Sequence, residues 1–182
     1  MAVALIATMA MVACGSDDDT ETMPQGGTVI DQTKLYGGWC EVERRQVNAD
    51  GSLQEPFDWT GFIGIEPEAC EIRPDKIYYF IRNYMDIDGY VSYNYTYDKD
   101  TQCINIYKGA KIQVLEVTDN HLKIVKPDWN NNNYQIIYKR MTDDTLKSYW
   151  EDHSVDLNEW EKENSNESIR YFAKMCRNMQ DF

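Results

Sequence analysis

The sequence is poor in basic side chains, and it has no long apolar run after its first residues. It contains 18 lysine and arginine residues against 31 aspartate and glutamate residues, for a formal net charge of −13. Nucleic-acid-binding proteins neutralise phosphates with basic patches. The charge balance therefore argues against a nucleic acid partner and against electrostatic docking on anionic lipid. A membrane-spanning helix needs about 20 apolar residues, and no segment after residue 13 approaches that length.

The sequence also lacks the common motifs of catalysis. It has no Gly-x-Ser-x-Gly, no phosphate-binding loop and no His-x-x-x-His. We interpret His121 as a solvated turn residue and His153 as a surface residue. Asp86 and Asp88 resemble the start of a calcium loop, but Gly89 follows too early and no downstream glutamate completes it; a turn is the better interpretation. We therefore expect no enzyme, no metal site and no cofactor.

Cysteine is scarce after residue 14, and histidine is scarce throughout. The four later cysteines have no close zinc-ligand spacing. An oxidising compartment would allow disulfides among them in any of three connectivities, and buried free thiols are the alternative. These cysteines are Cys40, Cys70, Cys103 and Cys176.

The first residues have the pattern of an exported protein. Residues 1–13 carry no charge and end in small side chains before Cys14, which is typical of a signal peptide. The junction, followed by Asp17-Asp18-Asp19, resembles the lipobox and acidic export tag of Bacteroidota lipoproteins. That resemblance implies that Cys14 carries diacylglycerol and that acyl chains such as palmitate anchor the protein. It also implies a lipoprotein on the outer face of the cell outer membrane. Several acyl chains would anchor the protein there stably.

The remaining chain divides by composition into three parts. Residues 14–33 are polar and acidic, and we expect them to form a flexible tether. Residues 34–141 alternate apolar segments with turn signals, as in an antiparallel meander. Residues 142–182 have helical spacing instead.

Eight strands are expected in the middle part. The clearest alternation places Val91, Tyr93, Tyr95 and Tyr97 on one face of a strand. The expected strands are 39–47, 60–66, 77–84, 91–97, 103–107, 112–117, 122–126 and 134–141.

A short motif at the first strand suggests a family. Gly37-x-Trp39 at the head of an eight-stranded meander resembles the lipocalin-like domains of bacterial surface lipoproteins. In that family the glycine permits a tight entry, the tryptophan plugs the closed end of the barrel, and a basic residue of the last strand packs over the ring. Alternation along the last strand selects Arg140 for that place, with Lys139 as the out-of-phase competitor.

The expected function is binding. An eight-stranded barrel either holds one small ligand or is filled by its own side chains. The first interpretation is a non-catalytic binder of a small apolar or amphipathic molecule. The alternative is a filled barrel that presents loops or helices to another envelope protein or a glycan. A pocket of several hundred Å³ would favour the ligand. The expected ligand-binding residues are Tyr93, Tyr95, Tyr97, Tyr134 and Tyr138.

The last part predicts short helices packed on the barrel. Leu146, Tyr149 and Trp150 follow helical spacing, and Asp156-x-x-Glu159 is a possible capping box. Further along, four apolar residues share a helical face and should cover the barrel wall or its open end. They are Ile169, Phe172, Cys176 and Met179.

Overall fold

The computed structural model describes residues 30–59, 67–84, 87–106, 110–128 and 130–163. The expected signal peptide, Cys14 and most of the tether lie outside these residues. So do the expected strand 60–66 and the C-terminal apolar stripe.

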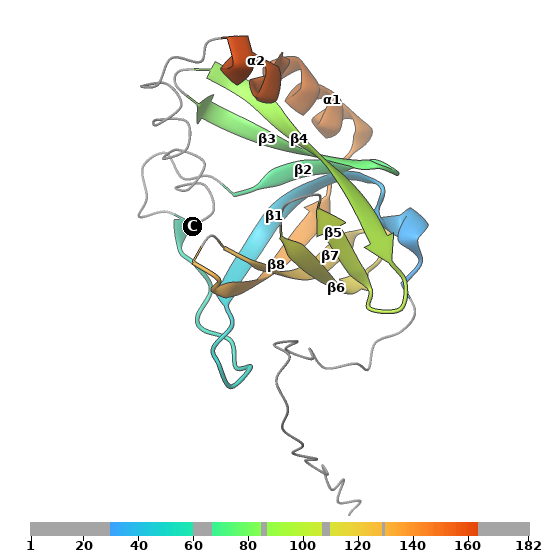
Figure 1. Cartoon of the computed structure of the whole chain (residues 1–182), viewed down its shortest axis with the longest axis vertical. Coiled ribbons are helices and arrows are strands. Elements are labelled where there is room, and N and C mark those ends of the chain that lie inside the picture. Colours follow the sequence, from blue (N-terminus) through green and yellow to red (C-terminus); the bar gives the residue numbers. More distant parts are fainter. Residues whose placement is uncertain (1–29, 60–66, 85–86, 107–109, 129, 164–182) are drawn as a thin grey trace, which may run out of the picture.

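Within the described residues, nine strands form one sheet, and the first eight close into an antiparallel barrel (Figure 1). Each strand pairs with the next along the chain, and β1 pairs with β8 to complete the circle. The predicted mainly β fold, an up-and-down eight-stranded barrel with helices packed on it, is confirmed. The barrel strands are β1 (Gly37–Gln46), β2 (Ala69–Ile72), β3 (Lys76–Tyr84), β4 (Ile87–Asp98), β5 (Cys103–Ile106), β6 (Lys111–Val117), β7 (His121–Pro127) and β8 (Asn133–Arg140).

Two details of the strands differ from the expectation. The second barrel strand, β2, is only four residues long, too short for its alternation to stand out in the sequence. The expected hairpin is present between β3 and β4, but its turn is shorter than residues 86–89, because Ile87 already pairs with Tyr84 and Gly89 pairs with Ile81. A Cβ at position 89 would lie 2.6 Å from the carbonyl oxygen of Val155. That glycine thus permits a close backbone approach inside a strand.

A β-bulge in β1 controls what this strand places in the barrel. The pairing with β8 shifts between Glu41 and Glu43, so the alternation of side chains changes phase there. As a result Glu41 and Arg44, three positions apart, are both buried. Without the bulge, a period of two would place them on opposite faces.

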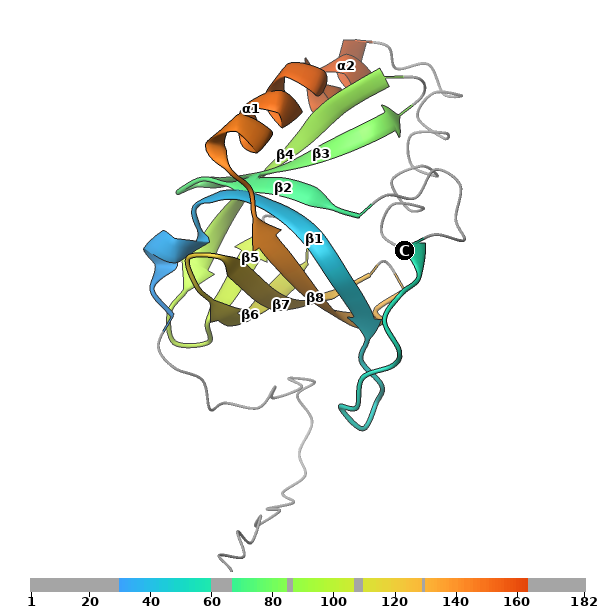
Figure 2. The same ribbon diagram turned by 180° about the vertical axis from the view of Figure 1, so that it is seen from behind.

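The C-terminal helices pack on the outside of the barrel (Figure 2). Helix α1 (Asp143–Asp152) is capped by Thr142, whose side chain accepts a hydrogen bond from the N–H of Thr145. Strand β9 (Val155–Asp156) then pairs in parallel with β4, and α2 (Leu157–Glu163) follows. The Asp156 carboxylate accepts hydrogen bonds from the N–H groups of Asn158 and Glu159, so it caps α2.

Helix α1 covers an aromatic patch on the outer face of β3 and β4. The ring of Trp150 lies 5.2 Å from that of Tyr78, 5.0 Å from that of Phe80 and 5.0 Å from that of Tyr90. His153 belongs to this cluster and is fully buried. The prediction that it is a surface residue is therefore wrong, because its face of the helix meets the aromatic patch rather than water.

Candidate ligand-binding site

One end of the barrel is closed by Trp39. Its side chain is fully buried, and its indole N–H donates a hydrogen bond of 2.8 Å to the carbonyl oxygen of Leu35. Leu35 belongs to η1 (Gln32–Leu35), the 3₁₀ turn that precedes β1. The guanidinium carbon of Arg140 lies 4.0 Å from the centre of the indole ring. Residue 140 pairs with residue 39 across β8 and β1, so both side chains enter the barrel at the same level.

Arg140 is held there by backbone carbonyl groups. Its guanidinium donates to the carbonyl oxygens of Lys34 at 2.5 Å, Tyr36 at 2.7 Å and Asp119 at 2.6 Å. Gly37 has a φ of +124°, and a Cβ at this position would lie 2.6 Å from the guanidinium. Only glycine therefore suits this entry to β1. The out-of-phase Lys139 is exposed.

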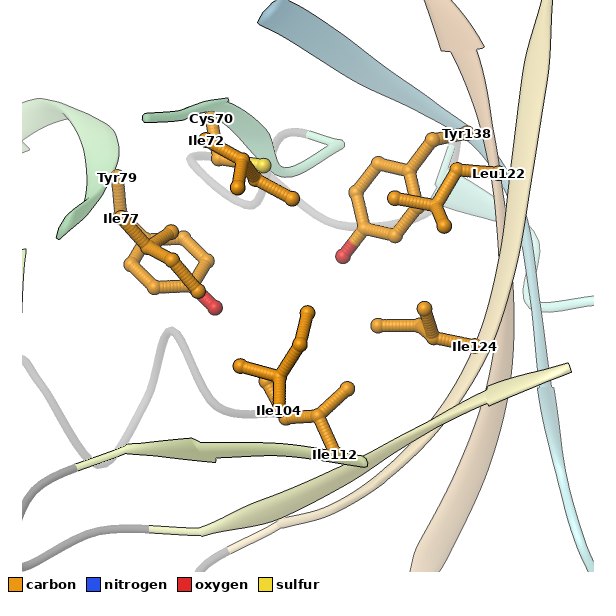
Figure 3. Close-up of a pocket in the computed structure, with 9 residues that line it drawn as sticks. All are labelled: Cys70, Ile72, Ile77, Tyr79, Ile104, Ile112, Leu122, Ile124 and Tyr138. Carbon is orange, nitrogen blue, oxygen red and sulfur yellow. The ribbon is translucent and has the colours of Figure 1, made fainter. Parts of the chain in front are cut away.

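The middle of the barrel contains an apolar pocket. Figure 3 shows its lining side chains directed at a common space, with the hydroxyl groups of Tyr79 and Tyr138 approaching from β3 and β8. Only these two lining side chains carry hydroxyl groups. The lining residues are Cys70, Ile72, Ile77, Tyr79, Ile104, Ile112, Leu122, Ile124 and Tyr138.

The pocket is tightly filled in this conformation. The space between its lining atoms is about 270 Å³ when narrow gaps and space open to solvent are counted. The centre of a water-sized sphere can occupy only about 10 Å³ of it. A single buried water needs about 10–15 Å³ of such space. The free volume of about 10 Å³ therefore accommodates roughly one water molecule.

The five tyrosines expected to bind a ligand occupy different places. Tyr138 lines the pocket. Tyr95 is buried in the core, and its hydroxyl donates to the carbonyl oxygen of Arg73 at 2.7 Å. Tyr97 and Tyr134 are partly buried against the core. Tyr93 packs against a separate apolar cluster that includes Leu157 of α2.

The isoleucines and Tyr79 of the pocket were not predicted as site residues. The signal that could have found Tyr79 is its position two residues after Ile77 in the β3 alternation. The tyrosines of β4 give the stronger sequence signal, because their repeat is more regular.

Four charged side chains lie beside the pocket and form what we call the interior ion cluster: Glu41, Arg44, Glu68 and Lys126. Arg44 donates two hydrogen bonds of 2.8 Å to the two carboxylate oxygens of Glu41. Lys126 donates to Glu68, and an Arg44 nitrogen lies 3.9 Å from the same carboxylate. The side chains of Glu41 and Arg44 are 0% and 3% exposed, and those of Glu68 and Lys126 are 16% and 15% exposed.

Tyr138 joins this cluster to the pocket. Its hydroxyl donates to the Glu68 carboxylate, and its ring lines the pocket. Burial raises the pKa of Tyr138 well above its ordinary value, and the negative charge of Glu68 raises it further. The hydroxyl therefore remains a proton donor at neutral pH.

The two carboxylates of the cluster titrate differently. Burial raises the pKa of Glu68, but Lys126 and Arg44 attract the ionised form and leave the pKa below its ordinary value. Burial also raises the pKa of Glu41, and the hydrogen bonds from Arg44 offset only part of that effect. Burial by itself would lower the pKa of Arg44, but its bonds to Glu41 outweigh burial and raise it. Glu68 is thus the carboxylate most firmly held in its charged form.

Aromatic side chains surround Arg44 at the same end of the barrel. Its guanidinium carbon lies 5.3 Å from the ring of Trp59 and 6.0 Å from that of Tyr134. The ring of Phe57 meets that of Trp59 edge-on at 4.7 Å. All three aromatic residues are partly exposed, so this aromatic group lies between the ion cluster and solvent.

Other kinds of site find little support among the described residues. Cys40, Cys70 and Cys103 have free thiols, and Cys176 lies outside the described part. No three histidine, cysteine, aspartate or glutamate side chains there are grouped as a metal site would need. None of the described helices is long and apolar enough to cross a membrane.

His121 is near Thr118, and its imidazole lies 3.0 Å from the Glu116 carboxylate.

The sequence matches no protein-family model and no curated protein. The cockroach major allergen Per a 4 is a similar solved structure, with 15% identity over 78% of this chain and 92% of that chain and a TM-score of 0.49. A complex of bovine odorant-binding protein with undecanal is similar at 12% identity over 82% of this chain and 98% of that one, with a TM-score of 0.40. The barrel itself has β1 to β8 in the closed up-and-down order that is the architecture of lipocalins.

Proposed function

We propose that the barrel binds a small apolar or amphipathic molecule and that it does not catalyse a reaction. The observation that carries this proposal is the apolar pocket bordered by the interior ion cluster. Burying charges stabilises a fold less than apolar packing of the same volume. Binding sites commonly combine an apolar pocket with a few buried charged groups whose pKa values are shifted.

The pocket must open for a ligand to enter. Its free space of about 10 Å³ holds no organic molecule, so lining side chains have to change rotamer on binding. Tyr79 and Tyr138 are the largest lining side chains, and both point at the common space (Figure 3). Their movement would give room to a compact molecule, whereas a bulky one would require the strands to separate.

The binding test is displacement of a fluorescent apolar dye by small alcohols, ketones and aromatic compounds. Ile112→Phe puts a larger side chain into the pocket lining and should abolish displacement. Leu115→Phe is the matched control, because residue 115 lies on the same strand and is 39% exposed. If both variants bind like the wild type, the barrel interior is not the site.

The filled interior favours a second candidate function. A packed barrel would serve as a rigid module that presents its loops or helices to an envelope protein or a glycan. The partly exposed Phe57 and Trp59 would then be contact residues, since aromatic side chains are enriched at interfaces. This candidate predicts no dye binding in the wild type. It also predicts that Trp59→Ala weakens capture of the purified domain by envelope preparations, whereas Ile112→Phe does not.

The anchoring of the chain is a separate proposal. It rests on the sequence around Cys14, which resembles the lipobox and acidic export tag of Bacteroidota lipoproteins, and it would place the protein on the outer membrane surface. Cys14→Ser should release the protein from the membrane fraction or block its processing. Wild-type fractionation of this variant would show that the anchor is elsewhere.

A further inference from the structure

The interior ion cluster carries no net formal charge. Glu41 and Glu68 supply two negative charges, and Arg44 and Lys126 supply two positive charges. Every member has a partner of opposite sign within 3.9 Å. Each negative charge is therefore already balanced without a ligand.

Two members of the cluster, Glu68 and Lys126, adjoin tyrosines that line the apolar pocket. Tyr138 lines the pocket and donates to Glu68, and the ammonium nitrogen of Lys126 lies 5.4 Å from the centre of the Tyr79 ring, which also lines the pocket. A polar group on a ligand in this pocket would thus meet the hydroxyl groups of Tyr79 and Tyr138 (Figure 3), with Lys126 and Glu68 next to these tyrosines.

A charged ligand would disturb this balance. A carboxylate would add a third negative charge beside Glu68, and an amine would add a third positive charge beside Lys126 and Arg44. An unbalanced charge in a buried site is strongly unfavourable. An uncharged oxygen has no such cost. Lys126 carries three N–H donors, and its hydrogen bond to Glu68 uses one of them.

We propose that the ligand is an uncharged molecule with a compact apolar body and one hydrogen-bond-accepting oxygen, of the alcohol or carbonyl class. The apolar body would occupy the pocket, and the oxygen would accept a hydrogen bond from Lys126. This inference rests on the proposed ligand-binding function. It adds that the balanced ion cluster selects against carboxylates and amines.

The test compares three probes of equal length: heptan-1-ol, heptanoate and heptan-1-amine. Their affinities for the domain are measured at pH 7 by displacement of the apolar dye. In the wild type we expect the alcohol to bind at least about 10-fold more tightly than either ion. Tighter binding of heptanoate or heptan-1-amine than of heptan-1-ol would overturn the inference.

Two charge variants sharpen the test. Glu68→Gln leaves a surplus positive charge, so heptanoate should gain relative to the alcohol. Lys126→Met leaves a surplus negative charge, so heptan-1-amine should gain and the alcohol should lose its hydrogen bond. Lys123→Met is the matched control, because Lys123 lies on the same strand but is out of phase with Lys126. If the affinities of heptanoate and heptan-1-amine relative to heptan-1-ol stay unchanged in both variants, the proposal is contradicted.

The outcomes also separate this inference from the function on which it rests. If none of the three probes displaces the dye or if the dye itself does not bind, ligand binding in the barrel fails. If the probes bind but the charged ones bind as well as the alcohol, the binding function stands and the selection by charge fails. Circular dichroism of each variant shows whether it is folded, and one folded variant is enough for the comparison.

Discussion

The two ends of the barrel interior hold cations in different ways, one at the closed end and two at the other end. At the closed end, Arg140 donates to three backbone carbonyl oxygens and stacks on Trp39. At the other end, Arg44 and Lys126 pair with the side chains of Glu41 and Glu68. Carbonyl oxygens do not titrate, whereas carboxylates do. The closed end is therefore a support that is insensitive to pH, and the ion cluster is an adjustable polar surface beside the pocket.

The difference also concerns what each end contributes to stability. The closed end combines a large buried ring with hydrogen bonds to a cation, which are among the stronger ones in proteins. The ion cluster offsets the desolvation of four charges by their mutual attraction, which often gains little over apolar packing. We infer that the closed end stabilises the fold and that the cluster is kept for binding.

The largest expected effect is the loss of the plug. Trp39→Ala should lower the free energy of unfolding by about 3–5 kcal/mol, because it leaves a cavity and removes the platform under Arg140. Trp59→Ala is the matched control at the other end, and it should cost less than about 1.5 kcal/mol because Trp59 is partly exposed. Urea denaturation measures both. Equal losses would contradict the assignment of the structural role to the closed end.

The next effect concerns the ion cluster and depends on pH. Glu68→Gln should lower the free energy of unfolding by about 2–3 kcal/mol at pH 7, because it leaves Lys126 without its partner. Since folding lowers the pKa of Glu68, its contribution is complete above the unfolded pKa of about 4.3. The contribution is lost as the pH falls through the folded pKa.

The wild type and Glu68→Gln should therefore differ less in stability at pH 3 than at pH 7. Glu43→Gln is the control, because it removes a carboxylate from the partly exposed pair that Glu43 forms with Arg45 on β1. It should lower the free energy of unfolding by less than about 1 kcal/mol at either pH. A difference for Glu68→Gln that stays constant from pH 7 to pH 3 would mean that its ionisation does not stabilise the fold.

The smallest effect is expected for Arg140→Lys. An ammonium keeps the charge but loses the planar fork that reaches three carbonyl groups, so the cost should be about 1 kcal/mol. Because its partners do not titrate, this cost should be the same at pH 5 and pH 8. A cost that changes with pH over that range would show that the closed end is coupled to a titrating group.

The closed end could be predicted from the sequence more fully than the ion cluster. The row from Tyr134 to Arg140 obeys a period of two along an unbroken strand, which selects Arg140 over Lys139. The resemblance to lipocalin-like domains implies that the selected residue packs over Trp39. Glu41 and Arg44 could not be placed this way, because the bulge between them changes the phase. Glu68 lies just before the short β2 and 27 positions after Glu41, and no local pattern connects them.

The helical part shows the same limit. Its spacing predicts helices, and the neighbouring sequence Asp156-x-x-Glu159 identifies Asp156 as a capping residue. The burial of His153 depends on Phe80 and Tyr149, whose rings lie 5.6 Å and 5.5 Å from the imidazole. Contacts with a strand about 70 positions earlier leave no signal in the helix itself.

The central claim is that the pocket in the barrel binds a small molecule, and isoleucine methyl NMR tests it most directly. Titration with heptan-1-ol should shift the methyl signals of Ile104, Ile112 and Ile124 saturably, because these side chains line the pocket. Ile137 directly precedes the pocket residue Tyr138 on β8 and so points to the opposite face of the sheet. Its methyl signals should keep their positions. Unchanged pocket methyl signals up to the solubility limit of the alcohol, or shifts confined to Ile137, would contradict the account.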